Sequence, residues 1–215
     1  MSEAALGIFG GTFDPVHFGH LRLAEEARHQ LGLGQVLWIP AGQPPLRERP
    51  GTLATDRLAM VARAIADNSG FALDPTEALA EVPSYTFDSL NRLRQLHGSQ
   101  RPLVLLLGAD AFIRLEQWYR WSELLDLAHI AVATRPGHAQ KLGASATALD
   151  TEFLARRSPP DEYKQQPAGH IIPFTITALD ISATALRRQL AKGIAPRYLA
   201  PDAVLDYIHQ HQLYI

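Results

Sequence analysis

The chain of 215 residues contains no cysteine, which excludes disulfides, thiolate catalysis, cysteine-ligated zinc and iron–sulfur clusters. It contains no apolar run approaching the ~18 residues that a membrane-spanning helix needs. Its N-terminus, interrupted by Glu3, lacks the basic-then-apolar pattern of a secretory signal. The formal net charge is only −2, so there is no bulk electrostatic reason to expect binding to nucleic acid or to an anionic membrane. These absences predict a cytoplasmic protein without nucleic-acid or membrane partners.

The composition is that of an ordinary globular protein, with 47% hydrophobic and 20% charged residues. Apolar runs typical of strands alternate with amphipathic helical segments, which predicts an α/β fold built on a Rossmann-like, doubly wound parallel sheet. The expected strands cover residues 6–9, 35–40, 71–73, 103–107, 129–134 and 171–174. The expected helices cover residues 18–31, 55–67, 86–97, 122–127, 182–191 and 201–210.

We expect a single domain over residues 1–215. Residues 137–166 are polar, lack clear periodicity and contain a Pro-Pro pair, so they are expected to form a peripheral segment with short helices. The C-terminal part, about residues 182–215, is expected to be helical. The apolar face expected for helix 86–97 consists of Phe87, Leu90, Leu93 and Leu96.

The most informative stretch is residues 10–20, Gly-Gly-Thr-Phe-Asp-Pro-Val-His-Phe-Gly-His, between the first expected strand and the first long helix. In a glycine-rich turn of this kind, backbone N–H groups approach an anion closely, and the helix N-terminus adds partial positive charge. His17 and His20 lie three residues apart where the helix begins, so both imidazoles can face that anion. Gly19 leaves room for its approach. The turn is therefore predicted to bind the phosphates of a nucleotide.

A second anion site is expected at the start of the helix over residues 182–191. Ser182 is a typical N-cap residue. The N–H groups of residues 183–185, with the hydroxyls of Ser182 and Thr184, form a cup suited to phosphates. Arg187 lies about one turn further, where it can clamp a leaving phosphate group.

Residues 10–20 resemble the first motif of the bacterial nucleotidyltransferases that carry a His-x-Gly-His element. Residues 181–187, Ile-Ser-Ala-Thr-Ala-Leu-Arg, are similar to a second motif of that family, Ile-Ser-x-Thr-x-x-Arg. The two motifs stand in the family's order, and the resemblance runs from Leu6 to Ile215. Within the family, the chain most resembles the nicotinate-nucleotide adenylyltransferases. The resemblance implies the nucleotidyltransferase type of the α/β fold.

The resemblance also implies an activity in NAD biosynthesis. The adenylyl group of ATP, bound with Mg²⁺, passes to nicotinate mononucleotide, giving deamido-NAD and pyrophosphate, with His17, His20 and Arg187 as the catalytic residues. The residues that the resemblance assigns to ATP are Gly10, Gly11, Thr12, Phe13, His17, Gly19, His20, Gly108, Asp110, Arg135, Ile181, Ser182, Thr184 and Arg187. Those assigned to the second substrate are Asp14, Arg47, Tyr85, Thr86, Trp118 and Tyr119.

The resemblance makes three of these assignments specific. The Trp118 ring stacks on the pyridine, although core packing is an equally simple role for a tryptophan. Backbone N–H groups of Thr86 and Tyr119 receive the ring carboxylate. Such N–H groups donate to the carboxylate of nicotinate. They disfavour nicotinamide, because its NH₂ group is itself a hydrogen-bond donor. Asp110 either binds the ATP ribose or merely caps the helix that follows it.

Three positions, in two segments of the chain, depart from the family pattern. Many relatives have a second serine where this chain has Ala183, so one hydroxyl contact is absent while the backbone donors remain. The family commonly has His-Lys after a Pro-Pro pair, and this chain has Leu46 and Arg47 there. Leu46 offers phosphate no polar group, and Arg47 keeps the positive charge expected to hold the mononucleotide phosphate.

Three other functions stay open at this point. The same chemistry can use another acceptor, such as nicotinamide mononucleotide or phosphopantetheine, or transfer a cytidylyl group. The chain can be a nucleotide sensor without turnover, although both motifs are intact. A metal-dependent hydrolase using His17, His20 and Asp14 is the third, but it needs further ligands that the motif does not supply. The oligomeric state is expected to be a monomer or a homodimer.

Overall fold

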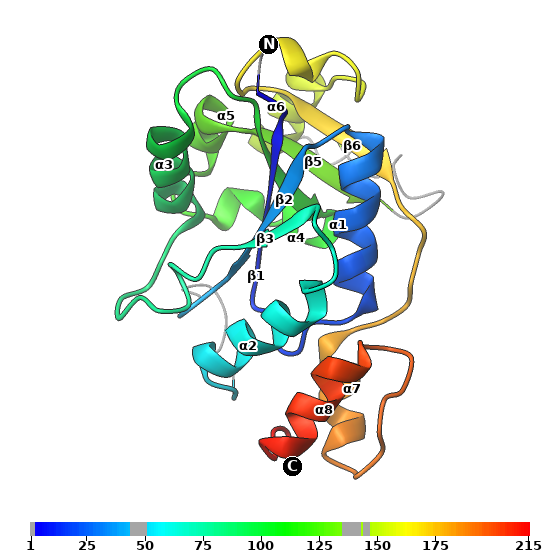
Figure 1. Ribbon diagram of the computed structural model, residues 1–215. Helices are drawn as coiled ribbons and strands as arrows, with labels where there is room; N and C mark the ends of the chain where they lie inside the picture. The colour runs from blue at the N-terminus through cyan, green and yellow to red at the C-terminus, as the bar shows by residue number, and fades with distance from the viewer. Residues whose placement is uncertain (1–2, 44–50, 135–142, 144–146) are drawn as a thin grey trace.

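A parallel sheet of six strands forms the centre of the computed structural model, which describes residues 3–43, 51–134, 143 and 147–215 (Figure 1). The strand order is β3-β2-β1-β4-β5-β6, and each pair of neighbours is parallel. The strands are β1 (Leu6–Gly11), β2 (Gln35–Pro40), β3 (Phe71–Leu73), β4 (Leu103–Gly108), β5 (His129–Thr134) and β6 (Ile171–Thr175). The predicted doubly wound α/β fold is therefore confirmed. In this order the connections change direction between β1 and β4, where such sheets bind ligands at the carboxyl ends of the strands.

The helices follow the predicted positions closely. They are α1 (Phe18–Gln30), α2 (Ala54–Ile65), α3 (Thr86–His97), α4 (Ala109–Phe112), α5 (Leu124–Leu127), α6 (Ala148–Arg156), α7 (Ala183–Leu190) and α8 (Asp202–Gln210). The predicted helix 122–127 is shorter as an α-helix, because its first turn is a 3₁₀ helix at Trp121–Glu123. Across the described ranges, no helix combines the length and apolarity needed to cross a membrane.

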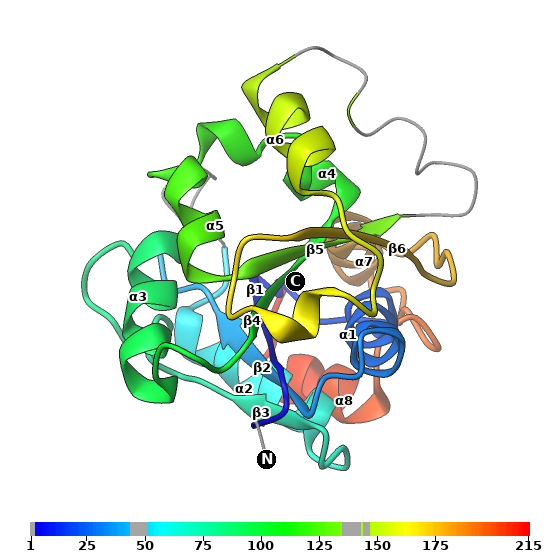
Figure 2. The same ribbon diagram turned by 90° about the horizontal axis from the view of Figure 1, so that it is seen from above.

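Two apolar clusters cover the two faces of the sheet, because successive strand residues point to opposite faces. Along β4, Val104 and Leu106 belong to the cluster covered by α1, α2 and α8. Leu103, Leu105 and Leu107 belong to the cluster covered by α3 to α6. Figure 2 shows α3 and α5 on one side of the sheet, with α1 and α8 on the other. This double burial explains why the predicted strands read as continuous apolar runs.

One predicted core residue is wrong. Phe87, Leu90 and Leu93 of α3 are buried as expected, but the side chain of Leu96 is 70% exposed. A helix turns by 100° per residue, so each step of three residues falls about 60° short of a full turn. Three such steps place Leu96 on the side of the helix opposite Phe87, which faces water.

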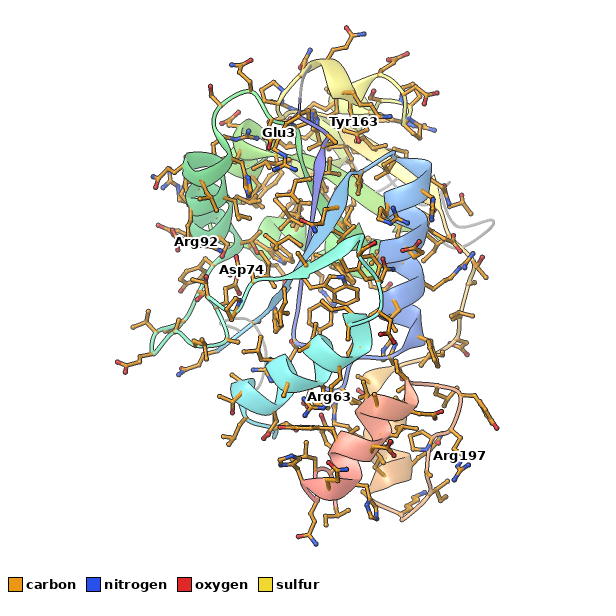
Figure 3. All side chains as sticks on the ribbon, in the orientation of Figure 1. Glu3, Arg63, Asp74, Arg92, Tyr163 and Arg197 are labelled. Carbon is orange, nitrogen blue, oxygen red and sulfur yellow. The ribbon has the colours of Figure 1, made fainter. Side chains whose placement is uncertain are left out.

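Figure 3 labels two contacts between neighbouring elements, one between the end of β3 and α3 and one between α2 and α8. Asp74, directly after β3, forms an ion pair with Arg92 of α3, and their side chains point toward one another. The guanidinium of Arg63 in α2 lies 4.3 Å from the ring centre of Tyr207 in α8, at the junction of these two helices. The C-terminal helices thus continue the layer on one face of the sheet and carry their residues toward the carboxyl ends of the strands.

The segment expected to be peripheral contributes Leu149, Phe153 and Tyr163 to the core. Tyr163 is fully buried (Figure 3), and its hydroxyl donates a hydrogen bond of 2.7 Å to the carbonyl of Leu31, the residue that ends α1. Its ring packs edge-on against His129 of β5, with 5.1 Å between ring centres. This contact satisfies a helix-end carbonyl that would otherwise be buried without a partner.

We expect Tyr163→Phe to lower the free energy of unfolding by about 1–2 kcal/mol, because it removes the hydrogen bond and leaves the Leu31 carbonyl unsatisfied. Urea-induced unfolding followed by circular dichroism measures the change. Tyr198→Phe is the matched control, since that tyrosine is largely exposed and should change stability by less than about 0.5 kcal/mol. Equal effects of the two substitutions would contradict the assigned role of Tyr163.

Candidate active site

The turn after β1 opens beside the end of β4. β1 pairs with β2 along Leu6–Gly11, whereas its pairing with β4 covers residues 6–8. Beyond that point a Cβ built on Gly108 meets no atom within 4 Å, and one built on Gly10 first meets an oxygen at 4.0 Å. Two glycines from neighbouring strands therefore border open space at the expected ligand-binding edge.

The ring of Phe13 supports the turn from the core side. Phe13 is buried, and its ring packs edge-on against His20, with 5.1 Å between ring centres. Its φ of 50° is in the left-handed region, which is strained for a bulky residue and persists only where surrounding contacts hold it. A Cβ on Gly11 would lie 2.9 Å from the Phe13 ring, so this position requires glycine. Of the residues predicted to bind ATP, Phe13 can therefore offer a ligand its backbone but not its ring.

The two histidines lie together at the start of α1, as predicted. Their rings stack with 3.7 Å between centres. The backbone N–H of His17 donates a hydrogen bond of 3.3 Å to Nδ1 of His20. Since Nδ1 of His20 accepts, the proton of the neutral ring is on Nε2, which makes that atom a donor. A Cβ on Gly19 would lie 3.0 Å from the His17 ring. The absence of a side chain at Gly19 thus leaves room for the His17 ring.

Burial changes the chemistry of His17. The residue is 5% exposed, and its Nδ1 has no hydrogen-bond partner among the described residues. Burial disfavours the imidazolium and lowers the pKa of His17 from 6.5 to about 4. At neutral pH, His17 therefore offers a ligand a hydrogen bond from an uncharged ring.

The second motif contacts the first directly. Nη1 of Arg187 donates to the carbonyl of Asp14 at 2.6 Å, and Nη2 donates to Oγ1 of Thr184 at 3.4 Å. The Ile181 carbonyl lies 3.7 Å from a Cβ built on Gly19. The structure therefore brings residues 10–20 and 181–187 together as one site, although they are far apart in the sequence.

Ser182 is the N-cap of α7, as predicted, and its Oγ accepts a hydrogen bond of 3.2 Å from the Ala185 N–H. This bond corrects one detail of the predicted anion cup, because the Ala185 N–H is engaged within the cap. The backbone donors left for a ligand at this helix start are those of Ala183 and Thr184.

Of the two roles expected for Asp110, the structure tests the capping role. Gly108 is the N-cap of α4, with no side-chain cap, and Asp110 lies exposed in the first turn of that helix. The capping role is therefore wrong. Arg135, Leu46 and Arg47 lie outside the described residues.

The residues predicted for the second substrate come from two segments that meet. Tyr85 contacts Tyr119 with 4.8 Å between ring centres, and Trp118 is half-buried against the cluster under α3 and α5. Thr86 is the first residue of α3. Within the described ranges, no acceptor is bonded to the N–H of Thr86 or to that of Tyr119. Two unengaged backbone donors and a partly exposed indole thus lie in neighbouring segments.

Arg57 of α2 is part of the site's framework and was missed from the sequence. Its guanidinium is almost fully buried and donates to the carbonyls of Thr12 (2.7 Å), Ala41 (2.6 Å) and Gly42 (2.8 Å). It thereby joins the turn after β1 to the segment after β2. The sequence carried no signal for this role, since an arginine on an amphipathic helix normally faces solvent.

A metal site finds no support in the part of the chain that is described, where no group of three or more His, Asp or Glu residues could hold an ion. Oδ1 of Asp14 accepts a hydrogen bond from the hydroxyl of Tyr214, and Oδ2 lies 3.9 Å from Nη1 of Arg187. A carboxylate with these neighbours is a poor candidate for ligating a metal together with His17 and His20. The geometry disfavours the hydrolase.

Comparison with known proteins decides the family. The profile of the cytidylyltransferase-like family matches residues 8–189. A probable nicotinate-nucleotide adenylyltransferase from Dechloromonas aromatica (strain RCB) is 54% identical over 215 residues, covering 100% of this chain and 99% of that protein. The chain belongs to the nicotinate-nucleotide adenylyltransferase family. A second probable nicotinate-nucleotide adenylyltransferase, from Acidithiobacillus ferrooxidans, is 45% identical and covers 97% of the chain and 95% of the relative.

Family membership makes this chain an enzyme of the nucleotidyltransferase class, as its two motifs predicted. The fold agrees with that of a solved member, the Plasmodium falciparum nicotinic acid mononucleotide adenylyltransferase complexed with NaAD. The TM-score is 0.72 at 17% identity, with 99% of this chain and 98% of that chain covered. At this low sequence identity, the similarity between the two chains shows a common fold and nothing more.

We expect stability to fall as the pH falls from about 6.5 to about 4. Burial lowers the pKa of both His17 and His129 from 6.5 to about 4, so in this window the unfolded chain binds protons that the native protein does not. Each histidine thus contributes about 3 kcal/mol above pH 6.5, and this contribution is lost on acidification. Urea unfolding at pH 7.5, 6 and 5 measures the dependence. His129 is remote from the site, so His129→Gln should reduce the slope without affecting the site, and an unchanged slope would refute the assignment.

Proposed function

We propose that the chain transfers the adenylyl group of ATP to nicotinate mononucleotide, giving deamido-NAD and pyrophosphate. One observation carries the proposal: His17, His20 and Arg187 converge at the carboxyl end of β1. The proposal is supported by full-length similarity to relatives named for this reaction.

In the proposed reaction, a 5′-phosphate oxygen of the mononucleotide attacks the α-phosphorus of ATP as the bond to the β-phosphate oxygen breaks. A phosphate monoester is already largely ionised at pH 7, since its second pKa is about 6, so no side chain has to act as nucleophile or base. Catalysis then comes from holding the two phosphates in line and stabilising the charge that develops.

The histidines and the arginine have different tasks in this scheme. His17 and His20 donate hydrogen bonds from Nε2 to the oxygens of the transferred phosphoryl group. His17 does so as a neutral ring, because burial lowers its pKa to about 4. Arg187 supplies positive charge to the leaving pyrophosphate, and the start of α7, with Ser182 and Thr184, binds the β- and γ-phosphates. Mg²⁺ enters as part of the MgATP substrate, because Mg²⁺ sites commonly use substrate phosphates and water.

The glycine-bordered space beside β4 fits the nucleoside of ATP. Gly10 and Gly108 leave it open, and the exposed carboxylate of Asp110 is suited to paired ribose hydroxyls. The N–H groups of Thr86 and Tyr119 are proposed to hold the nicotinate carboxylate, with the ring against Trp118. Tyr85 packs on Tyr119 and orders that segment.

We expect pyrophosphate release with MgATP and nicotinate mononucleotide, abolished by EDTA. With nicotinamide mononucleotide at equal concentration, kcat/KM should be at least about 100-fold lower, because the amide NH₂ would face the backbone donors. A coupled pyrophosphate assay measures both rates. Equal use of the two substrates would refute the proposed pyridine site, and release with neither would refute the proposed function.

We expect His17→Ala and His20→Ala each to lower kcat by about 10²–10³, the usual cost of removing one donor to a transition state. His29→Ala is the matched control, because it lies on the same helix with its imidazole exposed and paired with Glu25. Its kcat should stay within about twofold of the parent. Circular dichroism verifies that each variant is folded. Near-normal turnover of either site variant would exclude the catalytic role of that histidine.

A further inference from the structure

The C-terminal tail after α8 folds back onto the site. Gln212 and Tyr214 have φ angles of 51° and 66°, in the left-handed region that non-glycine residues rarely adopt. The Leu213 N–H donates to the Ile208 carbonyl at 3.0 Å, and Leu213 and Tyr214 pack against the core cluster under α1 and α2. A tail with two such residues is held in its conformation by its contacts.

The hydroxyl of Tyr214 contacts the phosphate-binding turn itself. It donates a hydrogen bond of 2.5 Å to Oδ1 of Asp14, a residue that is 7% exposed. Burial, together with the bond to Asp14, raises the pKa of Tyr214, so the hydroxyl keeps its proton and remains a donor. A charge-assisted bond of this kind is among the stronger hydrogen bonds in proteins.

Asp14 is also a neighbour of Arg187. The guanidinium donates to the backbone carbonyl of Asp14 at 2.6 Å, while its Nη1 lies 3.9 Å from Oδ2 of the same residue. The arginine thus contacts the turn firmly through the carbonyl and only loosely through the carboxylate. An unrestrained carboxylate at this distance would close onto the guanidinium, since a bidentate pair is the favoured geometry.

We propose that Tyr214 is a positioning residue for nucleotide binding: its hydroxyl holds the Asp14 carboxylate away from a close ion pair with Arg187. The guanidinium then stays available for the phosphates of ATP. This inference rests on the proposed function, in which Arg187 binds the leaving pyrophosphate. It also gives Asp14 a role in orienting Arg187 that differs from the contact with the mononucleotide expected from the sequence.

Tyr207 offers a comparison within the same part of the chain. Its hydroxyl donates a hydrogen bond of 2.8 Å to Oδ1 of Asp56, so it also pairs a C-terminal tyrosine with a carboxylate. Asp56 lies in the first turn of α2 and belongs to neither motif. Tyr207→Phe therefore removes an equivalent hydrogen bond without touching Asp14 or Arg187.

The test is steady-state kinetics of Tyr214→Phe and Tyr207→Phe on the full chain, with MgATP and nicotinate mononucleotide varied separately. We expect Tyr214→Phe to lower kcat/KM for MgATP about tenfold, mainly through KM, with the KM for the mononucleotide changing less than about twofold. Tyr207→Phe should leave both constants within about twofold. Urea unfolding should show similar small losses of stability for the two variants.

A double-mutant cycle tests the mechanism behind the effect. If the freed Asp14 carboxylate captures Arg187, Tyr214→Phe should change kcat/KM for MgATP by less than about twofold in an Asp14→Asn background. An undiminished tenfold loss in that background would overturn the proposal. So would a Tyr214→Phe effect confined to the KM of the mononucleotide, which would make Asp14 a contact of that substrate. Equal kinetics for the two tyrosine variants would overturn it too. Failure of the parent protein to release pyrophosphate would instead refute the proposed function.

Discussion

The geometry of the site depends on the hydrogen bonds from the buried guanidinium of Arg57 to backbone carbonyls. A cation removed from water is costly unless its donors are satisfied, and here several backbone carbonyls satisfy them. Those carbonyls belong to the turn after β1 and to the segment after β2. The two segments, already joined by the hydrogen bond from the Ala41 N–H to the Gly11 carbonyl, are thereby also fixed to the first turn of α2. The rigidity of the sheet is in this way extended into the irregular backbone where the chemistry is proposed to take place.

The buried ring of Phe13 imposes a second constraint on the turn after β1. The strained backbone of Phe13 places its ring between Gly11 and His20, and Gly19 allows His17 to stack on His20. Each glycine in the motif thus has a steric partner or an open space beside it. The strain at Phe13 is offset by burial of its ring, so the orientation of the histidines is set by core packing rather than by the ligand.

The sequence was sufficient to predict the sheet and most element boundaries, because strongly apolar strands and a glycine-rich strand-to-helix turn are local patterns. That the two motifs form one site was implied by the resemblance to a known family. Leu96 was misplaced, because residues spaced by three drift around a helix. Arg57 and Tyr214 could not be found, since their roles depend on tertiary neighbours that no local pattern encodes. The engaged N–H of Ala185 is a local contact, and it was missed because the N-cap side chain of Ser182 accepts from a donor that the motif alone leaves available. The contacts of Arg57 and Tyr214 are made with segments distant in the chain, and the sequence alone did not predict them.

The contact between the two motifs has a consequence for how the protein becomes active. Asp14 meets Arg187 and Tyr214 across 173 and 200 residues of sequence, and such long loops close late because their entropy must be overcome first. The sheet can assemble from nearer pairings, such as that of β1 with β2, before these contacts exist. A partly folded chain could therefore hold the turn with both histidines before Arg187 contacts it. The order in which these contacts form would then decide when Arg187 comes to lie beside the two histidines.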